Sequence, residues 1–330
     1  MKLDSVRSLK RELYEPFNGR GGLQPQHASQ VSVPAERTAD VALAQPGLAL
    51  GVARGTSEND YVLAVRVQHR DLVASSKLDA IRRAAHEEVD VRYIGQLTKL
   101  ASSQQSRIRP LRIGSSVGHV AITAGTIGAF VRVGDDPQPR LLSNNHVLAD
   151  ENRGDVGDAI LQPGRLDGGE PASDAIATLE RFEKLDGGRV NHVDAALALL
   201  ADGIDVITEI EGVGTPSNII AVEDVLSVAK LGRTTGLTYG TVTAIEVDNV
   251  VVDFSTGRLR FDGQIEIAGA DGQPFSKGGD SGSLIVDASN ASALGLLFAG
   301  SDQGGPHSTG VTYASPLGEV FDRLGIDGLW

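Results

Sequence analysis

The sequence predicts a mainly β protein with a small α/β region near its amino terminus. From about residue 111, short apolar runs recur between Gly, Asp and Asn turns, and helical patterns become rare. The chain holds 40 glycines but only 4% aromatic residues, as expected of a turn-rich globular protein. Many short strands separated by turn signals indicate a sandwich or a barrel. A length of 330 residues allows more than one domain.

A helix and an irregular arm are predicted for residues 1–46. Apolar residues recur at helical spacing over residues 2–17 and form one stripe. This stripe needs a partner, which we expect to be either the body of the same chain or a second subunit in a homo-oligomer. Residues 18–46 are rich in Gly, Gln, Ser and Pro and predict a linker or arm.

A small α/β domain is predicted for residues 47–110. Its helix is expected at 75–89, with Ser75 or Ser76 as the N-cap. The expected strands are 48–53, 61–67 and 91–94. No constellation of reactive side chains occurs in this part of the sequence, so we expect it to serve packing, regulation or assembly.

The β-rich pattern predicts a third region at residues 111–330. It ends in SPLGEVFDRLGI, which predicts a helix with Ser315 as its cap and Pro316 at its first position. The expected strands are 126–133, 140–143, 193–200, 225–231, 240–253, 258–267, 283–287 and 294–299.

Composition excludes several classes of protein. The net charge of −13, without a basic cluster, argues against nucleic-acid binding, which requires a basic face. Because the chain has no cysteine, it can form neither disulfides nor a thiolate metal site, and we expect no metal and no cofactor. No apolar leader or membrane-spanning run is apparent, so we expect a cytoplasmic protein without membrane contact.

One short segment presents a candidate nucleophile. In Gly278-Gly279-Asp280-Ser281-Gly282, glycines on both sides of a serine precede an apolar strand. Glycine permits unusual backbone angles, so the N–H groups of Gly279 and Ser281 could turn inward together as an oxyanion hole. The alternative is that this segment is only a tight turn entering the strand.

A histidine and an aspartate complete the set that serine catalysis needs. A serine hydroxyl becomes nucleophilic when a histidine takes its proton and a carboxylate orients that histidine. His146 follows the apolar end of 140–143, and Asp194 stands at the head of the apolar run VDAALALL, where an unpaired acid would be costly. Either residue alone could instead have a structural role.

These segments resemble the trypsin-like, chymotrypsin-fold serine peptidases. SNNHVL, VDAALALL and GDSGS match separately, in the order His, Asp, Ser, and the resemblance covers roughly residues 111–326. It implies two six-stranded antiparallel β-barrels, with His146 and Asp194 from the first and Ser281 from the second. KLGRTTGLTYGTV, residues 230–242, resembles a segment of bacterial and plant narrow-leaf type members, although by itself it predicts only a Gly-rich hairpin.

The resemblance also implies a primary substrate pocket. Its base would be Phe275, six residues before Ser281, so no preference for Arg or Lys is expected. An aromatic base would make the pocket shallow, suited to an apolar side chain of small or medium size. The walls would be Phe298, Ala299, Gly300 and Gly310.

The chain also departs from the family pattern. Many members are activated by a cleavage that frees an amino terminus, which then pairs with the acid before the serine, here Asp280. Arg112-Ile113-Gly114 resembles such a cleavage site only faintly. We therefore expect a site that forms without cleavage, with Lys277 or Arg233 as the partner of Asp280.

The sequence thus predicts a serine endopeptidase that hydrolyses protein or peptide substrates through an acyl-enzyme. One alternative is an oligomeric scaffold or binding protein that retains a weakly active triad. Another is a protease that cleaves only itself.

Overall fold

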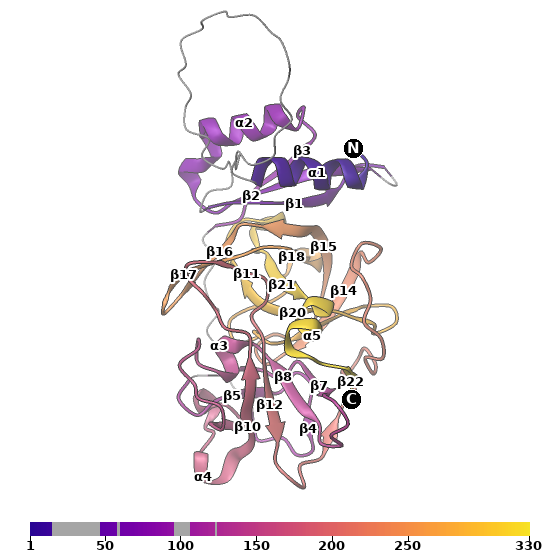
Figure 1. Cartoon of the computed structure of the whole chain (residues 1–330). Coiled ribbons are helices and arrows are strands. Elements are labelled where there is room, and N and C mark those ends of the chain that lie inside the picture. Colours follow the sequence, from indigo (N-terminus) through magenta and orange to yellow (C-terminus); the bar gives the residue numbers. More distant parts are fainter. Residues whose placement is uncertain (15–46, 58–59, 96–105, 123) are drawn as a thin grey trace, which may run out of the picture.

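The computed structural model describes residues 1–14, 47–57, 60–95, 106–122 and 124–330. Its two largest sheets have nine and eight strands. Figure 1 shows them as a stack, with the N-terminal elements above a middle barrel and the remaining strands below. The arm predicted at residues 18–46 lies outside the described residues.

The middle part of the stack is a closed barrel. The strands follow the order β14-β19-β20-β21-β18-β15, and β15 also pairs with β14, so that the ring closes with antiparallel ladders throughout. Apolar side chains such as Ile265, Ile285 and Leu297 form one core cluster of these strands. The bounds are β14 (Ser227–Gly232), β15 (Gly236–Asp248), β18 (Gln264–Gly269), β19 (Leu284–Asp287), β20 (Ala293–Gly300) and β21 (Thr312–Pro316).

The lower part is a curled antiparallel sheet in the order β22-β7-β8-β12-β10-β9-β5-β6. Its edge strands β6 and β22 have two residues each and do not pair with one another within the described part of the chain. The bounds are β5 (Ser116–His119), β6 (Gly125–Thr126), β7 (Ala129–Arg132), β8 (Arg140–Ser143), β9 (Ala159–Leu161), β10 (Ala175–Phe182), β12 (Ala196–Leu200) and β22 (Gly328–Leu329).

The predicted mainly β, double-barrel fold is therefore confirmed, with one correction. The barrel that carries Ser281 is closed, whereas the one that carries His146 and Asp194 is an open half-barrel, since its edge strands β6 and β22 do not pair within the described residues.

The remaining short strands form two further small sheets. β11 (Val190–Asn191) runs parallel to β17 (Gly257–Phe261), which forms a hairpin with β16 (Val250–Phe254), and β13 (Val206–Ile207) runs parallel to β4 (Leu111–Arg112). The helical pieces are α3 (Asn145–Leu148), α4 (Pro171–Asp174), η2 (Arg165–Asp167), η3 (Ala270–Gly272) and η4 (Pro306–Ser308).

The closing helix α5 spans Leu317–Leu324 and buries the predicted apolar stripe. Its predicted cap is wrong by one residue. Pro316 is the N-cap, and Ser315 belongs to β21, where its hydroxyl donates to Oε1 of Gln264 at 3.0 Å. Once that hydroxyl is bonded to the neighbouring strand, it is not available to the helix.

The N-terminal elements extend the sheet of the closed barrel. β1 pairs with the second half of β15, with Leu50 opposite Asp248 and Val52 opposite Ile245. β2 and β3 form a parallel pair joined through α2, whose predicted cap Ser75 accepts the N–H of Leu78 at 3.2 Å. The bounds are α1 (Leu3–Tyr14), β1 (Leu48–Arg54), β2 (Tyr61–Val67), η1 (Arg70–Ala74), α2 (Ser76–Ala84) and β3 (Val89–Tyr93). The domain boundaries drawn from the sequence stay predictions.

The apolar stripe of α1 has its partner within the same chain. Val6 and Leu13 are buried and cluster with Leu48, Leu50 and Leu78 of the N-terminal elements. Of the two partners expected from the sequence, the body of the chain is the one observed. The stripe gives no support for a homo-oligomer.

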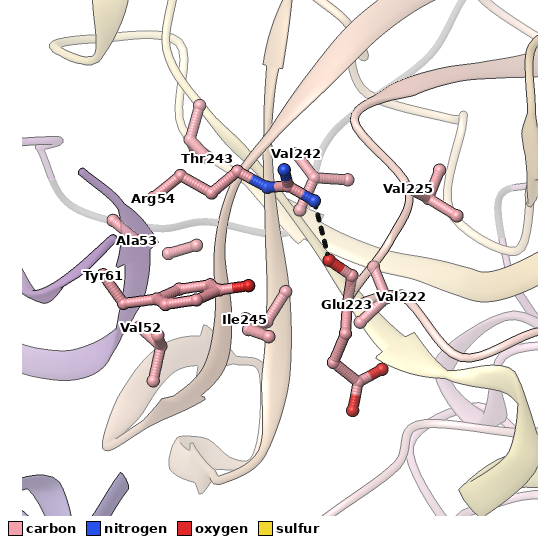
Figure 2. A pocket seen from close by; sticks show the side chains of 11 residues that line it. Val52, Ala53, Arg54, Tyr61, Val222, Glu223, Val225, Val242, Thr243 and Ile245 are labelled. Carbon is pink, nitrogen blue, oxygen red and sulfur yellow. Dashed lines mark hydrogen bonds between the residues drawn. The ribbon is translucent and has the colours of Figure 1, made fainter. Parts of the chain in front are cut away.

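Side chains pack closely between β1 and the closed barrel, around a small cavity. Figure 2 shows Val52, Tyr61 and Ile245 around a small cavity, with Arg54 reaching across it to donate to the carbonyl oxygen of Glu223 at 2.8 Å. The cavity measures about 20 Å³, which is room for one water molecule. Tight packing therefore joins the N-terminal strands to the barrel.

A buried ion pair crosses the same junction. Arg66 on β2 and Glu266 on β18 are both fully buried, and Nε of Arg66 lies 2.5 Å from Oε2 of Glu266. The carboxylate also accepts hydrogen bonds from the hydroxyls of Tyr313, at 2.8 Å, and Thr243, at 2.6 Å. Burial, and secondly the charge of Glu266, raise the pKa of the Tyr313 phenol well above its usual value, so it remains a donor.

We expect Arg66→Met to lower the free energy of unfolding by about 3–5 kcal/mol, because the Glu266 carboxylate would remain buried without its cation. The double variant Arg66→Met/Glu266→Leu should lose less, since no charge is left unpaired. Urea denaturation followed by circular dichroism measures both. Equal losses in the single and double variants would contradict this account.

Candidate active site

His146 lies in a one-turn helix at the end of a barrel strand. β8 ends at Ser143, and α3 follows directly with His146 as its second residue. The turn is held by Asn145, whose side-chain amide donates to the carbonyl oxygen of Glu183 at 2.7 Å and to Oδ1 of Asn152 at 2.8 Å. The His146 side chain is consequently fixed and 4% exposed.

Asp194 contacts His146 at two places. Its Oδ2 lies 2.5 Å from Nδ1 of the imidazole, and its Oδ1 accepts the backbone N–H of His146 at 3.2 Å. Asp194 is fully buried two residues before β12, and the side chain of Asn144 donates to its carbonyl oxygen at 2.6 Å. A carboxylate oxygen accepts hydrogen bonds, so this contact matches the imidazole tautomer that has its proton on Nδ1 and none on Nε2.

Ser281 lies beside the segment that carries His146. A Cβ placed on Gly125 would lie 2.4 Å from Cγ2 of Val147 and 2.9 Å from the carbonyl oxygen of Ser281. The same carbonyl accepts the N–H of Thr126 at 2.8 Å. The Ser281 hydroxyl is buried and has no hydrogen-bond partner in the described part of the chain, so it is not bonded to His146 in this state.

Gly282 allows residues 277–282, the serine turn, to pack on the strand that leads to His146. Its φ is +93°, and a Cβ there would lie 2.4 Å from the carbonyl oxygen of Thr126 and 2.1 Å from Oγ of Ser143. Both the backbone angle and the close approach therefore require glycine at this position.

The two predicted oxyanion donors are unused. The N–H groups of Gly279 and Ser281 donate to no acceptor within the described residues. Gly279 has a φ of +90°, which glycine adopts without strain. The geometry thus leaves two amides next to the serine hydroxyl available to a ligand.

Asp280 is fully buried, and its cationic partner differs from both predicted residues. Nζ of Lys230 lies 3.3 Å from Oδ2 of Asp280. Lys277 contributes only its backbone N–H, at 2.9 Å, and Arg233 pairs instead with Asp167 at 2.5 Å. Lys230 extends from β14, which precedes the serine turn by many residues in the sequence. Burial lowers the pKa of the Lys230 ammonium despite the attraction of Asp280.

An aromatic row that the sequence did not reveal adjoins His146. The ring of Phe254 meets the imidazole edge to face at 5.9 Å between centroids, and Phe261 and Phe298 continue the row at 6.0 and 4.7 Å. Phe254 and Phe261 belong to the β16–β17 hairpin, so this hairpin forms an apolar wall beside the histidine. No motif in the sequence marked it.

The predicted pocket residues occupy two clusters. Phe275 is 2% exposed and packs with the core of the closed barrel, whereas Phe298 and Ala299 pack with Phe261. Gly300 ends β20 opposite Thr312, whereas Gly310 lies two residues before β21 and donates its N–H to the carbonyl oxygen of Gly304 at 2.9 Å. Between these groups the hydroxyls of Ser276 and Thr312 are bonded at 2.7 Å, a contact that the sequence did not indicate. The pocket itself stays a prediction.

The described residues form neither a metal-binding cluster nor a membrane-spanning helix. The described residues contain no group of three or more His, Cys, Asp or Glu side chains that could hold a metal ion. None of the helices in the described ranges is long and apolar enough to cross a membrane.

Comparisons with known proteins find similarity only among solved structures. No family model matches the chain, and no curated protein shows significant sequence similarity to it. Similar folds occur in Thermobifida fusca protease A (19% identity, TM-score 0.46), Cellulomonas bogoriensis chymotrypsin (18%, 0.46) and the Nocardiopsis protease NAPase (18%, 0.47). Each covers 66% of this chain and 98% of the other. The fold and the site are assigned from the strand pairings and contacts above.

We expect Gly282→Ala to destabilise the protein more strongly than Gly134→Ala. Both positions have positive φ, which costs a non-glycine residue about 1–2 kcal/mol, but only Gly282 faces backbone atoms within 3 Å, while Gly134 faces open space. Thermal unfolding of the two variants measures the difference. Equal midpoints would show that the turn is not packed as described.

Proposed function

We propose that this protein is a serine endopeptidase that acts through an acyl-enzyme intermediate. The observation that carries the proposal is the double contact of Asp194 with the ring and backbone of His146, together with a buried Ser281 hydroxyl that has no hydrogen-bond partner among the described residues. In this proposal Ser281 is the nucleophile, His146 the general base and Asp194 the residue that orients it.

The contacts support one sequence of steps. With Nδ1 bonded to Asp194, Nε2 of His146 can take the hydroxyl proton as Oγ of Ser281 attacks the peptide carbonyl. The resulting oxyanion would accept the N–H groups of Gly279 and Ser281. His146 then gives its proton to the leaving amine, and a water molecule activated by the same imidazole hydrolyses the acyl-enzyme. The missing bond between Ser281 and His146 is common in sites without substrate, where such contacts are loose.

The Lys230–Asp280 pair supports a site that forms without proteolytic activation. The carboxylate of Asp280 already has a buried cation and the N–H groups of Thr234, at 2.8 Å, and Lys277, at 2.9 Å. No new amino terminus is needed to neutralise it. Ile113, within the faint cleavage motif, is itself packed in the core of the half-barrel.

An active-site fluorophosphonate probe tests the proposed nucleophile. We expect the wild type to gain the mass of one probe molecule and Ser281→Ala to gain none, because the serine oxygen forms the covalent bond. Ser289→Ala, which removes an exposed hydroxyl from the following turn, should label like the wild type. An unlabelled wild type would favour the scaffold, and a chain truncated in the wild type but intact in Ser281→Ala would indicate self-cleavage.

Asp194→Asn should reduce the rate of peptide hydrolysis about 10⁴-fold, because an amide can stabilise the wrong tautomer of His146. Substrate affinity should change little. Initial rates on a fluorogenic peptide measure the effect, with the exposed Asp205→Asn as the matched control. A loss of less than tenfold would remove Asp194 from the proposed mechanism.

A further inference from the structure

Two hydroxyls hold the peptide groups whose N–H bonds would form the oxyanion hole. We propose that Thr234 and Ser283 are positioning residues that fix the direction of the Gly279 and Ser281 amides. This inference rests on the proposed function, because it assigns a role within the same site. Neither residue touches the reacting atoms, and each acts through the backbone of the serine turn.

Thr234 holds the first peptide group. Its hydroxyl donates to the carbonyl oxygen of Gly278, and its own N–H donates to Oδ1 of Asp280 at 2.8 Å. The Gly278–Gly279 bond is trans, so the N–H of Gly279 points away from the carbonyl that Thr234 holds. The hydroxyl on one side therefore sets the direction of the amide on the other.

Ser283 holds the second peptide group. The carbonyl of Asp280 accepts both the N–H of Ser283, at 3.0 Å, and its hydroxyl, at 2.6 Å. Ser283 is fully buried, and its carbonyl accepts the N–H of Leu297 on β20 at 3.0 Å, which ties it to the barrel. The Asp280–Ser281 bond is also trans, so the N–H of Ser281 is directed away from Ser283.

The intervening peptide group is held in the same manner. The carbonyl of Gly279 accepts the hydroxyl of Thr126 at 2.8 Å, and the N–H of Asp280 donates to the carbonyl of Lys277 at 3.0 Å. Of the N–H groups of Gly279, Asp280 and Ser281, only that of Asp280 has an acceptor within the described residues, and the preceding N–H of Gly278 has none. Hydroxyl groups thus bind three consecutive carbonyl oxygens of this turn, those of Gly278, Gly279 and Asp280.

These hydrogen bonds matter because the peptide group between two adjacent glycines can adopt a flipped orientation. Glycine populates positive and negative φ about equally, so the backbone alone does not favour the orientation that the oxyanion needs. If the Gly278–Gly279 unit rotated, its N–H would leave the site and its carbonyl would enter it. The effect would fall on the transition state, where the negative charge develops, and much less on substrate binding.

The test is steady-state kinetics on a fluorogenic peptide selected from a library by the wild type. We expect Thr234→Val and Ser283→Ala each to lower kcat about tenfold or more, with KM within about twofold, since losing one oxyanion donor costs about 10²–10³-fold. Thr234→Ser keeps the hydroxyl and should stay within about threefold of wild type. Inhibition by a peptidyl trifluoromethyl ketone, which forms a tetrahedral oxyanion, should weaken in parallel with kcat.

Ser75→Ala is the matched control, because its hydroxyl donates to the carbonyl of Leu72 at 2.8 Å in the N-terminal elements, away from the serine turn. Should Thr234→Val fail to fold, as judged by circular dichroism, Ser283→Ala decides the question. Variants with wild-type kcat, or with raised KM and unchanged kcat, would overturn this inference. Failure of the proposed function is a separate result, seen as a wild type that neither hydrolyses peptides nor labels.

Discussion

The buried carboxylate of Asp280 is the constraint on which the site depends. An ionised group without solvent requires a cation and hydrogen-bond donors around it, and here they come from three segments. Lys230 extends from β14, Thr234 and Thr235 lie in the turn before β15, and Lys277 begins the serine turn. The contacts of this one charge therefore hold the backbone that leads up to Ser281.

A second buried carboxylate has a different consequence. Glu266 binds a cation from a strand 200 residues away in sequence, and so it fastens the N-terminal elements to the barrel. Glu266 lies in β18 and Asp280 lies in the serine turn before β19, so the closed barrel connects the serine turn with the N-terminal elements. Removal of either cation would leave the carboxylate of Asp280 or Glu266 buried without a counter-charge.

Local patterns predicted the parts of this protein that depend on short segments. The serine turn, the SNNHVL step and the apolar run after Asp194 each indicated a candidate residue, and the structure brings His146 and Asp194 together. The sequence did not predict contacts between residues that lie far apart along the chain. Pairing of β1 with β15 depends on a register set by packing, and the partner of Asp280 depends on which side of β14 faces inward. The aromatic wall beginning at Phe254 had no local signal for the same reason.

Because β14 and β15 pair to close the middle barrel, β3 is the remaining edge strand of the nine-stranded sheet among the described residues. An edge strand has unpaired backbone N–H and C=O groups that can pair with a strand of another chain, and such pairing leads to aggregation. β3 carries alternating charges, and Asp90 is bound by Arg66 and Arg92 at 2.9 and 3.0 Å. The charged side chains of these ion pairs disfavour the addition of a strand from another chain to β3. The edge at which the N-terminal extension of the sheet ends therefore carries its own safeguard against edge-to-edge association.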